Sequence, residues 1–309
     1  MQHVTKVSQN ALLAGASALL VGGVAYRYGV GSQPSPGPKV MKVMSYNVLA
    51  RPYTTYNTMH HRAPSRIEDK VQTITRYTLA GETILSSGSD VVLLQECEGA
   101  FFKSDWNAAA ERLAQQYTVF LCGEGEKPGT AILVKKTGEV TPLAEKALWI
   151  GGTDATGGVS KSAAILPVQF GHKTVDMVSV HFTWDGLHQK RTHHAQLLGG
   201  SLQSSSIVLA GDFNCEPGKM LNDLEQASFL KSMQRAALLN NAPTGLSSDF
   251  SKEVALDHLY TSADLQVITA FAQGRPDSPW GGSLSRPAKV ARASDHVPVV
   301  ATVTEKITE

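Results

Sequence analysis

Short apolar runs that end in a polar residue recur along the chain. The run at 207–210 is entirely apolar and leads into Gly211, Asp212 and Asn214. Such a run, bounded by turn-forming residues, is typical of a strand buried on both faces. An isolated carboxylate inside that strand would be too costly, so we expect Asp212 where the strand leaves the core. Asn214 points the same way if the chain stays extended, whereas a plain turn capped by Asp and Asn is the alternative.

The same pattern predicts the other elements. Strands are expected at 40–50, 90–96, 117–121, 130–134, 163–170, 174–181, 254–260, 265–271 and 293–303. Apolar residues at helical spacing predict helices over 66–86, 104–115 (with Ser104 as N-cap), 188–204 and 219–226 (with Pro217 in the first turn). Residues 240–252 are polar and weakly patterned, and no element is expected there.

Polar side chains stand at an end of these predicted strands, or within them. A lone buried histidine is more often a hydrogen-bonded core residue than a catalyst, so no single position is specific. The recurrence is informative, because a domain without a site would desolvate these acids and imidazoles for nothing. The positions are Asn47, Glu96, His181, Asp212 with Asn214, Asp257, and Asp295 with His296.

The oxygen donors among these residues suit a magnesium ion. Glu96 and Asn47 offer hard ligands, and Mg²⁺ keeps several waters while taking one or two carboxylates. Mn²⁺ is the alternative ion. No Cys/His spacing fits zinc, and the P-loop, G-x-S-x-G and G-x-G-x-x-G motifs do not occur.

The remaining positions match the hydrolysis of a phosphate ester by water. His181 and His296 can donate hydrogen bonds to phosphoryl oxygens, where charge grows in the transition state. Asp257, or another acid, can hold His296 in one tautomer and raise its pKa. Asp212 can orient and deprotonate the attacking water, with Asn214 holding its geometry. We therefore expect metal-assisted hydrolysis without a covalent intermediate.

Seven motifs resemble, in their order, those of the endonuclease/exonuclease/phosphatase superfamily, which includes deoxyribonuclease I. They are Ser45-Tyr46-Asn47-Val48-Leu49-Ala50, Leu94-Gln95-Glu96, Gly129-Thr130-Ala131-Ile132, His181, Gly211-Asp212-Phe213-Asn214, Leu256-Asp257-His258-Leu259 and Ser294-Asp295-His296. The first motif is most similar to the deadenylase group that contains Nocturnin, Angel proteins and 2′-phosphodiesterase. The resemblance covers roughly residues 41–304 and implies an α/β fold, a four-layer α/β/β/α sandwich of two mixed sheets flanked by helices.

The resemblance also implies roles for individual residues. Asn47 and Glu96 would hold the metal, with Asp295 close to it and to its waters. By the same resemblance, Asp212 and Asn214 would orient and activate the water. His181 and His296 would contact the scissile phosphate, and Asp257 would support His296.

Charge restricts the substrate. Three of the 28 basic residues and none of the 27 acidic residues lie before residue 40, so the remainder carries 25 basic against 27 acidic side chains. A nearly neutral domain is not a general duplex-binding surface. We expect a monomeric 3′-exonuclease or phosphodiesterase acting on single-stranded RNA ends; the alternatives are hydrolysis of a small or lipid phosphodiester, as in sphingomyelinases, or of tyrosyl-DNA. Arg191, Tyr53 and Trp280 are candidate substrate contacts, through a phosphate or by stacking on bases.

The N-terminal region has its own composition. Residues 11–26 form an apolar run of 16, flanked by Lys6 and Arg27 and followed by a Pro/Gly/Ser linker. The run is short for a spanning helix, and a secretory signal, a membrane anchor and an organelle presequence all fit it. The absence of acids favours a mitochondrial address, with or without anchoring, and an endomembrane signal anchor is the alternative. Three widely spaced cysteines indicate a reducing compartment. We therefore divide the chain into a targeting segment and linker at 1–39 and a catalytic domain at 40–309.

Overall fold

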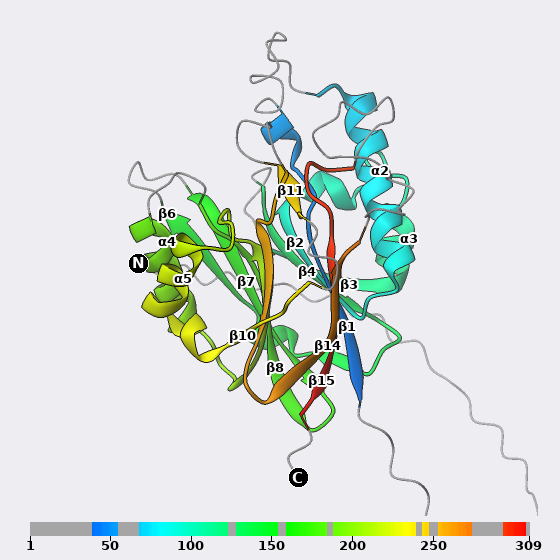
Figure 1. Ribbon diagram of the computed structural model, residues 1–309. Helices are drawn as coiled ribbons and strands as arrows, with labels where there is room; N and C mark the ends of the chain where they lie inside the picture. Colours follow the sequence, from blue (N-terminus) through cyan, green and yellow to red (C-terminus); the bar gives the residue numbers. More distant parts are fainter. Residues whose placement is uncertain are drawn as a thin grey trace, which may run out of the picture. The chain divides into compact units, whose positions relative to one another are not determined.

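Two mixed β-sheets lie face to face, and helices cover their outer faces (Figure 1). The computed structural model describes residues 39–54, 68–122, 128–153, 159–183, 188–238, 243–246, 253–273 and 293–306. Contacts within the chain separate residues 1–36 from residues 37–309, and every described residue belongs to the second unit.

The first sheet has six strands. Their order is β14 (Leu265–Ala272), β15 (Val299–Glu305), β1 (Val40–Asn47), β2 (Val91–Cys97), β4 (Gly129–Lys135) and β3 (Tyr117–Cys122). Strands β1 and β2 are parallel, and the other pairs are antiparallel.

The second sheet has seven strands. Its main path is β10 (Gln234–Arg235), β13 (Asp257–Thr261), β9 (Ser206–Asp212), β8 (Lys173–His181), β7 (Val159–Phe170) and β5 (Val140–Pro142), and β6 (Leu148–Thr153) also pairs with β7. Strands β8 and β9 are parallel. A separate two-stranded ribbon consists of β11 (Gly245–Leu246) and β12 (Glu253–Val254).

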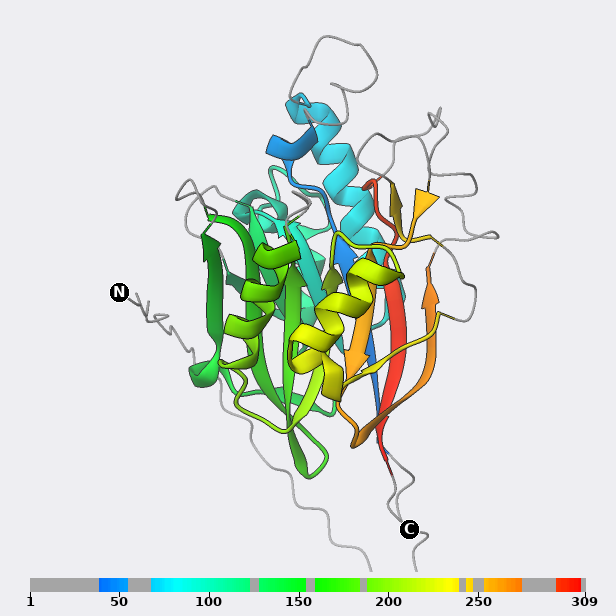
Figure 2. The same cartoon turned by 60° about the vertical axis from the view of Figure 1, so that its left-hand side comes forward.

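Helices cover both outer faces. Helices α2 (Lys70–Ser87) and α3 (Ala110–Gln116) lie on the first sheet, and α4 (His188–Gly199) and α5 (Lys219–Ala227) lie on the second (Figure 2). Short 3₁₀ turns occur at η1 (Arg51–Tyr53), η2 (Gly99–Phe102), η3 (Ala144–Lys146) and η4 (Phe229–Ser232).

Three hydrophobic cores separate these layers. One joins the two sheets through residues such as Val43, Leu93 and Met177. A second packs the first sheet against α2 through Tyr77 and Ile84. The third, which includes Leu198 of α4, packs the second sheet against its helices. Three apolar interfaces make four layers, so the expected α/β/β/α sandwich is confirmed.

Local signals explain several element boundaries, and some expectations were wrong. Helix α2 begins after the capping box of Asp69, not at residue 66, and ends at Gly88 with φ of 62°. Ser104 is not a cap, because α3 begins after Ala109. Pro217 precedes α5, whose N-cap is Gly218.

Other differences affect the strands. Strand β15 starts at Val299, so Asp295 and His296 lie in the preceding loop and not in the strand. Strands β5, β6 and β10 and the ribbon β11–β12 were not expected. Within the described part of the chain, no helix combines the length and apolar character needed to cross a membrane. The segment 11–26 lies outside the described residues.

Candidate metal and phosphoester site

Parallel strand pairs determine where the polar side chains meet. Asn47 is the last residue of β1 and stands opposite Gln95 of β2, next to Glu96. His181 ends β8 directly opposite Asp212, which ends β9. Because parallel strands present their carboxyl ends at one edge, each sheet delivers its pair to the same end of the sandwich. The Nδ2 of Asn47 donates to Oδ2 of Asp212 at 3.0 Å, which joins the two sheets at this edge.

Asp212 is the centre of the cluster. Its Oδ2 lies 3.4 Å from Nε2 of His181 and 3.7 Å from Nε2 of His296. The Nε2 of His181 also lies 3.6 Å from Oε1 of Glu96. Asp257 pairs with Asp212 in the antiparallel register of β13 and β9. With Asn47, six of the predicted residues are thus brought together by backbone pairing and short side-chain distances.

The cluster fits a divalent cation. Ligand atoms of Glu96, His181 and Asp212 all lie within 4.8 Å of one another. Two carboxylates and one imidazole suit Mg²⁺ less than an all-oxygen set would, and they also suit Mn²⁺. The prediction had placed His181 on the phosphate rather than near the metal, and this geometry makes it a candidate for either role.

Asp257 holds His296 at the edge of the cluster. Oδ2 of Asp257 lies 2.8 Å from Nδ1 of His296, and both side chains are buried. Burial lowers the pKa of His296, but the charges of Asp257 and Asp212 outweigh it, so the pKa lies well above its ordinary value. The raised pKa favours the protonated imidazole of His296, whose Nε2 lies on the side of Asp212, 3.7 Å from its Oδ2.

Backbone strain is concentrated at the same place. Among the described residues, positive φ outside glycine occurs at Leu49 (52°), Glu96 (51°) and Asn214 (49°). Two of these are predicted site residues and the third follows Asn47 by two positions. Such conformations cost about 1–3 kcal/mol each and persist where surrounding structure enforces them, typically at functional sites.

Gly211 packs against the neighbouring strand, and Asn214 differs from expectation. A Cβ on Gly211 would lie 1.8 Å from the carbonyl oxygen of Val180, so this glycine permits the close approach of β9 to β8. The chain does not stay extended at Asn214. Its main-chain N–H donates to Oδ1 of Asp212 at 2.8 Å, and its Nδ2 donates to the carbonyl of Phe182 at 2.8 Å. Asp212 therefore caps a turn and takes part in the cluster at once.

The remaining predicted residues lie in the loop before β15, in α4 and in η1, or outside the described chain. Asp295 is half-buried, accepts a hydrogen bond from Ser294 at 3.3 Å, and is not one of the converging donors named above. Arg191 is buried, and its Nε donates to the carbonyl of Thr183 at 2.7 Å. Tyr53 is half-buried in η1. Trp280 lies outside the described residues.

Thr244 and Gly245 were missed by the sequence analysis. Oγ1 of Thr244 accepts the N–H groups of Leu256 and Asp257 at 3.0 and 2.9 Å. A Cβ on Gly245 would lie 3.0 Å from both Cε1 and Nδ1 of His296. These residues thus fix the Asp257–His296 pair from the ribbon side. Two isolated residues in a polar stretch carry no periodic signal that could have revealed them.

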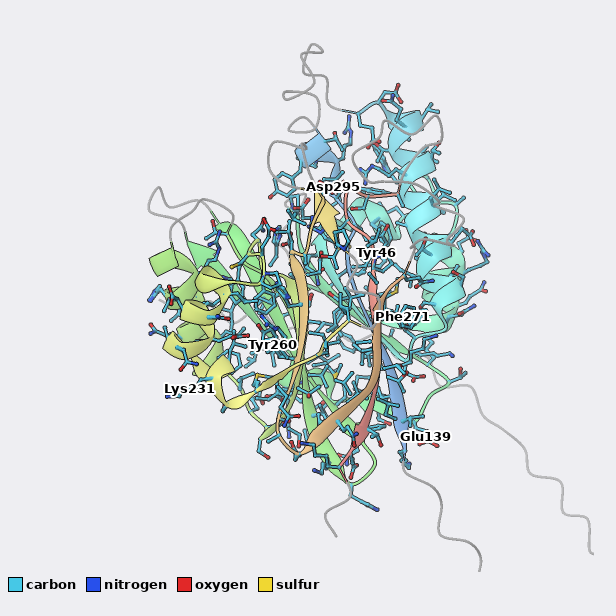
Figure 3. All side chains as sticks on the ribbon, viewed as in Figure 1. Tyr46, Glu139, Lys231, Tyr260, Phe271 and Asp295 are labelled. Carbon is cyan, nitrogen blue, oxygen red and sulfur yellow. The ribbon has the colours of Figure 1, made fainter. Side chains whose placement is uncertain are left out.

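Arg76 was also missed. Its Nη1 donates to the carbonyls of Val48 (2.9 Å), Leu49 (2.6 Å) and Ala293 (3.3 Å), and its Nη2 pairs with Glu68 at 2.9 Å. It therefore ties α2 to the two segments that carry Asn47 and Asp295. Arg76 shares a helix face with the buried Tyr77 and Ile84, and this position in the helical pattern could have indicated that its side chain is buried. Figure 3 shows Asp295 at this end of the sandwich, above Tyr46.

Comparisons with known proteins concern the family and the fold. Residues 44–296 match the Endonuclease/Exonuclease/phosphatase family. No curated protein matches the chain by sequence.

Similar solved structures include three in which nearly the whole chain superposes. ANGEL2, described as a 2′,3′-cyclic phosphatase, has a TM-score of 0.66 at 15% identity, covering 87% of this chain and 96% of that one. D. rerio TDP2 complexed with single-strand DNA product has a TM-score of 0.59 at 14% identity, with coverage of 85% and 98%. The human Nocturnin catalytic domain with bound sulfate has a TM-score of 0.59 at 16% identity, with coverage of 86% and 95%. At these identities the likeness shows the fold alone.

Proposed function

The chain belongs to the Endonuclease/Exonuclease/phosphatase family, whose members are metal-dependent phosphodiester hydrolases, and from this premise we propose that it is a Mg²⁺-dependent 3′-exonuclease acting on single-stranded RNA ends. One observation carries the hydrolytic part of the proposal: Glu96, His181 and Asp212 place ligand atoms within 4.8 Å of one another. Mn²⁺ is the alternative ion, because an imidazole lies in that set.

Each residue has a defined task in the proposed reaction. Asn47 and Glu96 would hold a divalent ion, which would supply Lewis-acid polarisation of the phosphoryl group, and His181 would bind either that ion or the phosphate. Asp212, oriented by the amide of Asn47, accepts the proton of the attacking water. The imidazolium of His296 donates a hydrogen bond to an oxygen of the scissile phosphate, where negative charge increases in the transition state. Asp257 keeps that imidazole oriented and protonated.

Two arguments support a single-stranded RNA end as the substrate. One is the low net charge of the domain, and the other is its likeness to enzymes that act on nucleic acids or on phosphate esters. A nearly neutral domain cannot rely on broad attraction to a duplex and suits a short single-stranded end better. Similar structures include a 2′,3′-cyclic phosphatase and an enzyme with single-strand DNA product. These support a phosphate ester at the end of a nucleic acid as the substrate class.

A substrate panel tests the proposal. Oligo(A), mixed-sequence RNA, 5′-tyrosyl DNA and sphingomyelin are each incubated with Mg²⁺, Mn²⁺ or chelator. We expect metal-dependent release of nucleotides from RNA 3′ ends. Turnover of sphingomyelin or tyrosyl-DNA without RNA degradation would replace the exonuclease with one of those activities. If every substrate that is hydrolysed with metal is hydrolysed equally well in chelator, the result would contradict the proposed metal site itself.

We also propose that residues 11–26 direct the protein to mitochondria. The support is compositional: an apolar run with flanking basic residues and no acid before Glu68. Fusion of residues 1–39 to a fluorescent protein gives the direct test. Mitochondrial fluorescence is expected, whereas an endomembrane pattern would favour the signal-anchor alternative.

A further inference from the structure

Two cationic side chains from different elements converge on one indole. Cζ of Arg51, at the start of η1, lies 5.5 Å from the ring centroid of Trp106, and Nζ of Lys70, at the start of α2, lies 4.9 Å from it. Trp106 is half-buried between η2 and α3. The ring attracts each cation through its quadrupole. It therefore gathers two like charges, which repel each other unless an anion lies near both.

Apart from Glu98, whose carboxylate contacts the main chain of Arg51, the described carboxylates neutralise this pair only weakly. The Arg51 side chain donates from Nε to the main-chain carbonyl of Glu68 at 3.2 Å, while the carboxylate of Glu68 is engaged by Arg76. Lys70 has Asp105 at 3.9 Å, with both side chains more than half exposed, and such a pair contributes little. The sequence of residues 55–67 contains no acidic residue. An anion from outside the chain would complete the charge balance.

The pair is anchored next to the proposed site. The main-chain N–H of Arg51 donates to Oε1 of Glu98 at 3.3 Å, and the hydroxyl of Tyr77 hydrogen-bonds the same oxygen. Glu98 follows Glu96 by two residues. Both η1 and the start of α2 lie at the end of the sandwich where Figure 3 labels Asp295. One substrate could therefore reach both places.

We propose that Arg51 and Lys70, held by Trp106, bind a phosphate group of the substrate other than the one that is cleaved. The inference rests on the proposed phosphodiesterase function and narrows its substrate to an oligonucleotide. A lipid diester with a single phosphate would leave this pair unused.

Neutralising the pair tests the inference. The double variant Arg51→Gln/Lys70→Gln is compared with the native chain on a single-stranded octaribonucleotide and on bis(4-nitrophenyl) phosphate, which has one phosphate. For the octamer we expect KM to rise about tenfold and the slope of log KM against log salt to fall by about 0.7 per lost contact. The small diester should keep its kcat and KM. Equal losses on both substrates, or no change on the octamer, would overturn the inference.

Controls keep the result interpretable. Lys70→Gln alone changes an exposed side chain and should give a partial rise in KM with unchanged thermal unfolding. Arg112→Gln also removes an exposed cation that links α2 to α3, through its pair with Glu82, and should leave octamer KM unchanged. Binding of a fluorescent octamer, measured by anisotropy, tests the pair without turnover. If the native chain hydrolyses neither substrate, the proposed function fails, whereas binding that is unaffected by the double variant contradicts the inference alone.

Discussion

The two ends of strands β8 and β9 carry similar residue types and use them differently. At the amino ends, Asp264 accepts from Nζ of Lys173 (2.6 Å) and from the hydroxyls of Ser206 (2.5 Å) and Ser262 (2.6 Å). At the carboxyl ends, His181 and Asp212 face each other at 3.4 Å, beyond hydrogen-bond length for a strong charged pair.

The residues around Asp264 stabilise the fold, whereas those around Asp212 have the features of a reactive site. Ion pairing and three hydrogen bonds overcome the burial of Asp264 and lower its pKa to about 2, so its charge is fully matched within the fold. At the other end, Glu96, His181 and Asp212 place ligand atoms within 4.8 Å of one another, and φ is positive at Glu96 and Asn214. Several ligand atoms gathered on a strained backbone therefore indicate function, whereas a single charge paired within the fold indicates stability.

Removing the central acid should have the largest effect. Asp212→Asn keeps the size of the side chain but removes the base, so kcat should fall about 10³-fold or more. The amide oxygen can accept only one of the two hydrogen bonds, from Asn47 and Asn214, that the carboxylate accepts, so the free energy of unfolding should fall by about 1–3 kcal/mol and the fold should survive. The measurement is single-turnover hydrolysis of a short RNA with Mg²⁺. A rate within tenfold of the native value would remove Asp212 from the proposed reaction.

A second prediction concerns stability in acid. Burial lowers the pKa of His258 to about 4, and its Nε2 lies 2.8 Å from the carbonyl oxygen of Cys215. Because the folded pKa lies below the unfolded value of about 6.5, stability is complete above pH 6.5 and declines as pH falls toward 4. The loss should reach about 3 kcal/mol, from roughly 1.4 kcal/mol per unit of pKa.

Urea unfolding between pH 7 and pH 4 measures this loss. His258→Gln, which cannot titrate, should reduce the slope, and His193→Gln, at an exposed histidine, should not. The same slope in His258→Gln as in the native chain would show that other groups dominate acid unfolding.

Gly245 gives a smaller effect that acts through His296. An alanine Cβ would lie 3.0 Å from Cε1 and Nδ1 of that imidazole, so the ring must shift by a few tenths of an ångström. Misplacement of a catalytic group on this scale should lower kcat about tenfold while KM stays near its native value. Gly200→Ala, whose new Cβ would meet nothing nearer than 3.7 Å, is the matched control. Equal rates for both variants would mean that the ribbon does not position His296.

The sequence predicted most of the strands, and the polar positions at the ends of β1, β2, β8 and β9, because each of these strands carries its own apolar run. It could not reveal how the ends pair. The contact of Asn47 with Asp212 spans the two sheets, and the contacts of Gly245 with His296 arise from tertiary packing alone. Asn214 was misread for a local reason: its φ of 49° turns the chain where extension was assumed. Arg76 could have been noticed, since a charged residue on an apolar helix face needs buried partners.

The smallest predicted effect returns to the amino ends of β8 and β9. Asp264→Asn should lower the free energy of unfolding by about 1 kcal/mol at pH 7, since solvent screens this half-exposed pair. Because the pKa of Asp264 is lowered to about 2, its contribution is present above pH 4 and disappears as pH falls through 2. The variant and the native chain should therefore converge in stability near pH 2, as measured by urea unfolding. RNA hydrolysis by the variant should be unchanged at pH 7, and a large loss of rate there would show that the two ends of these strands are coupled and not independent.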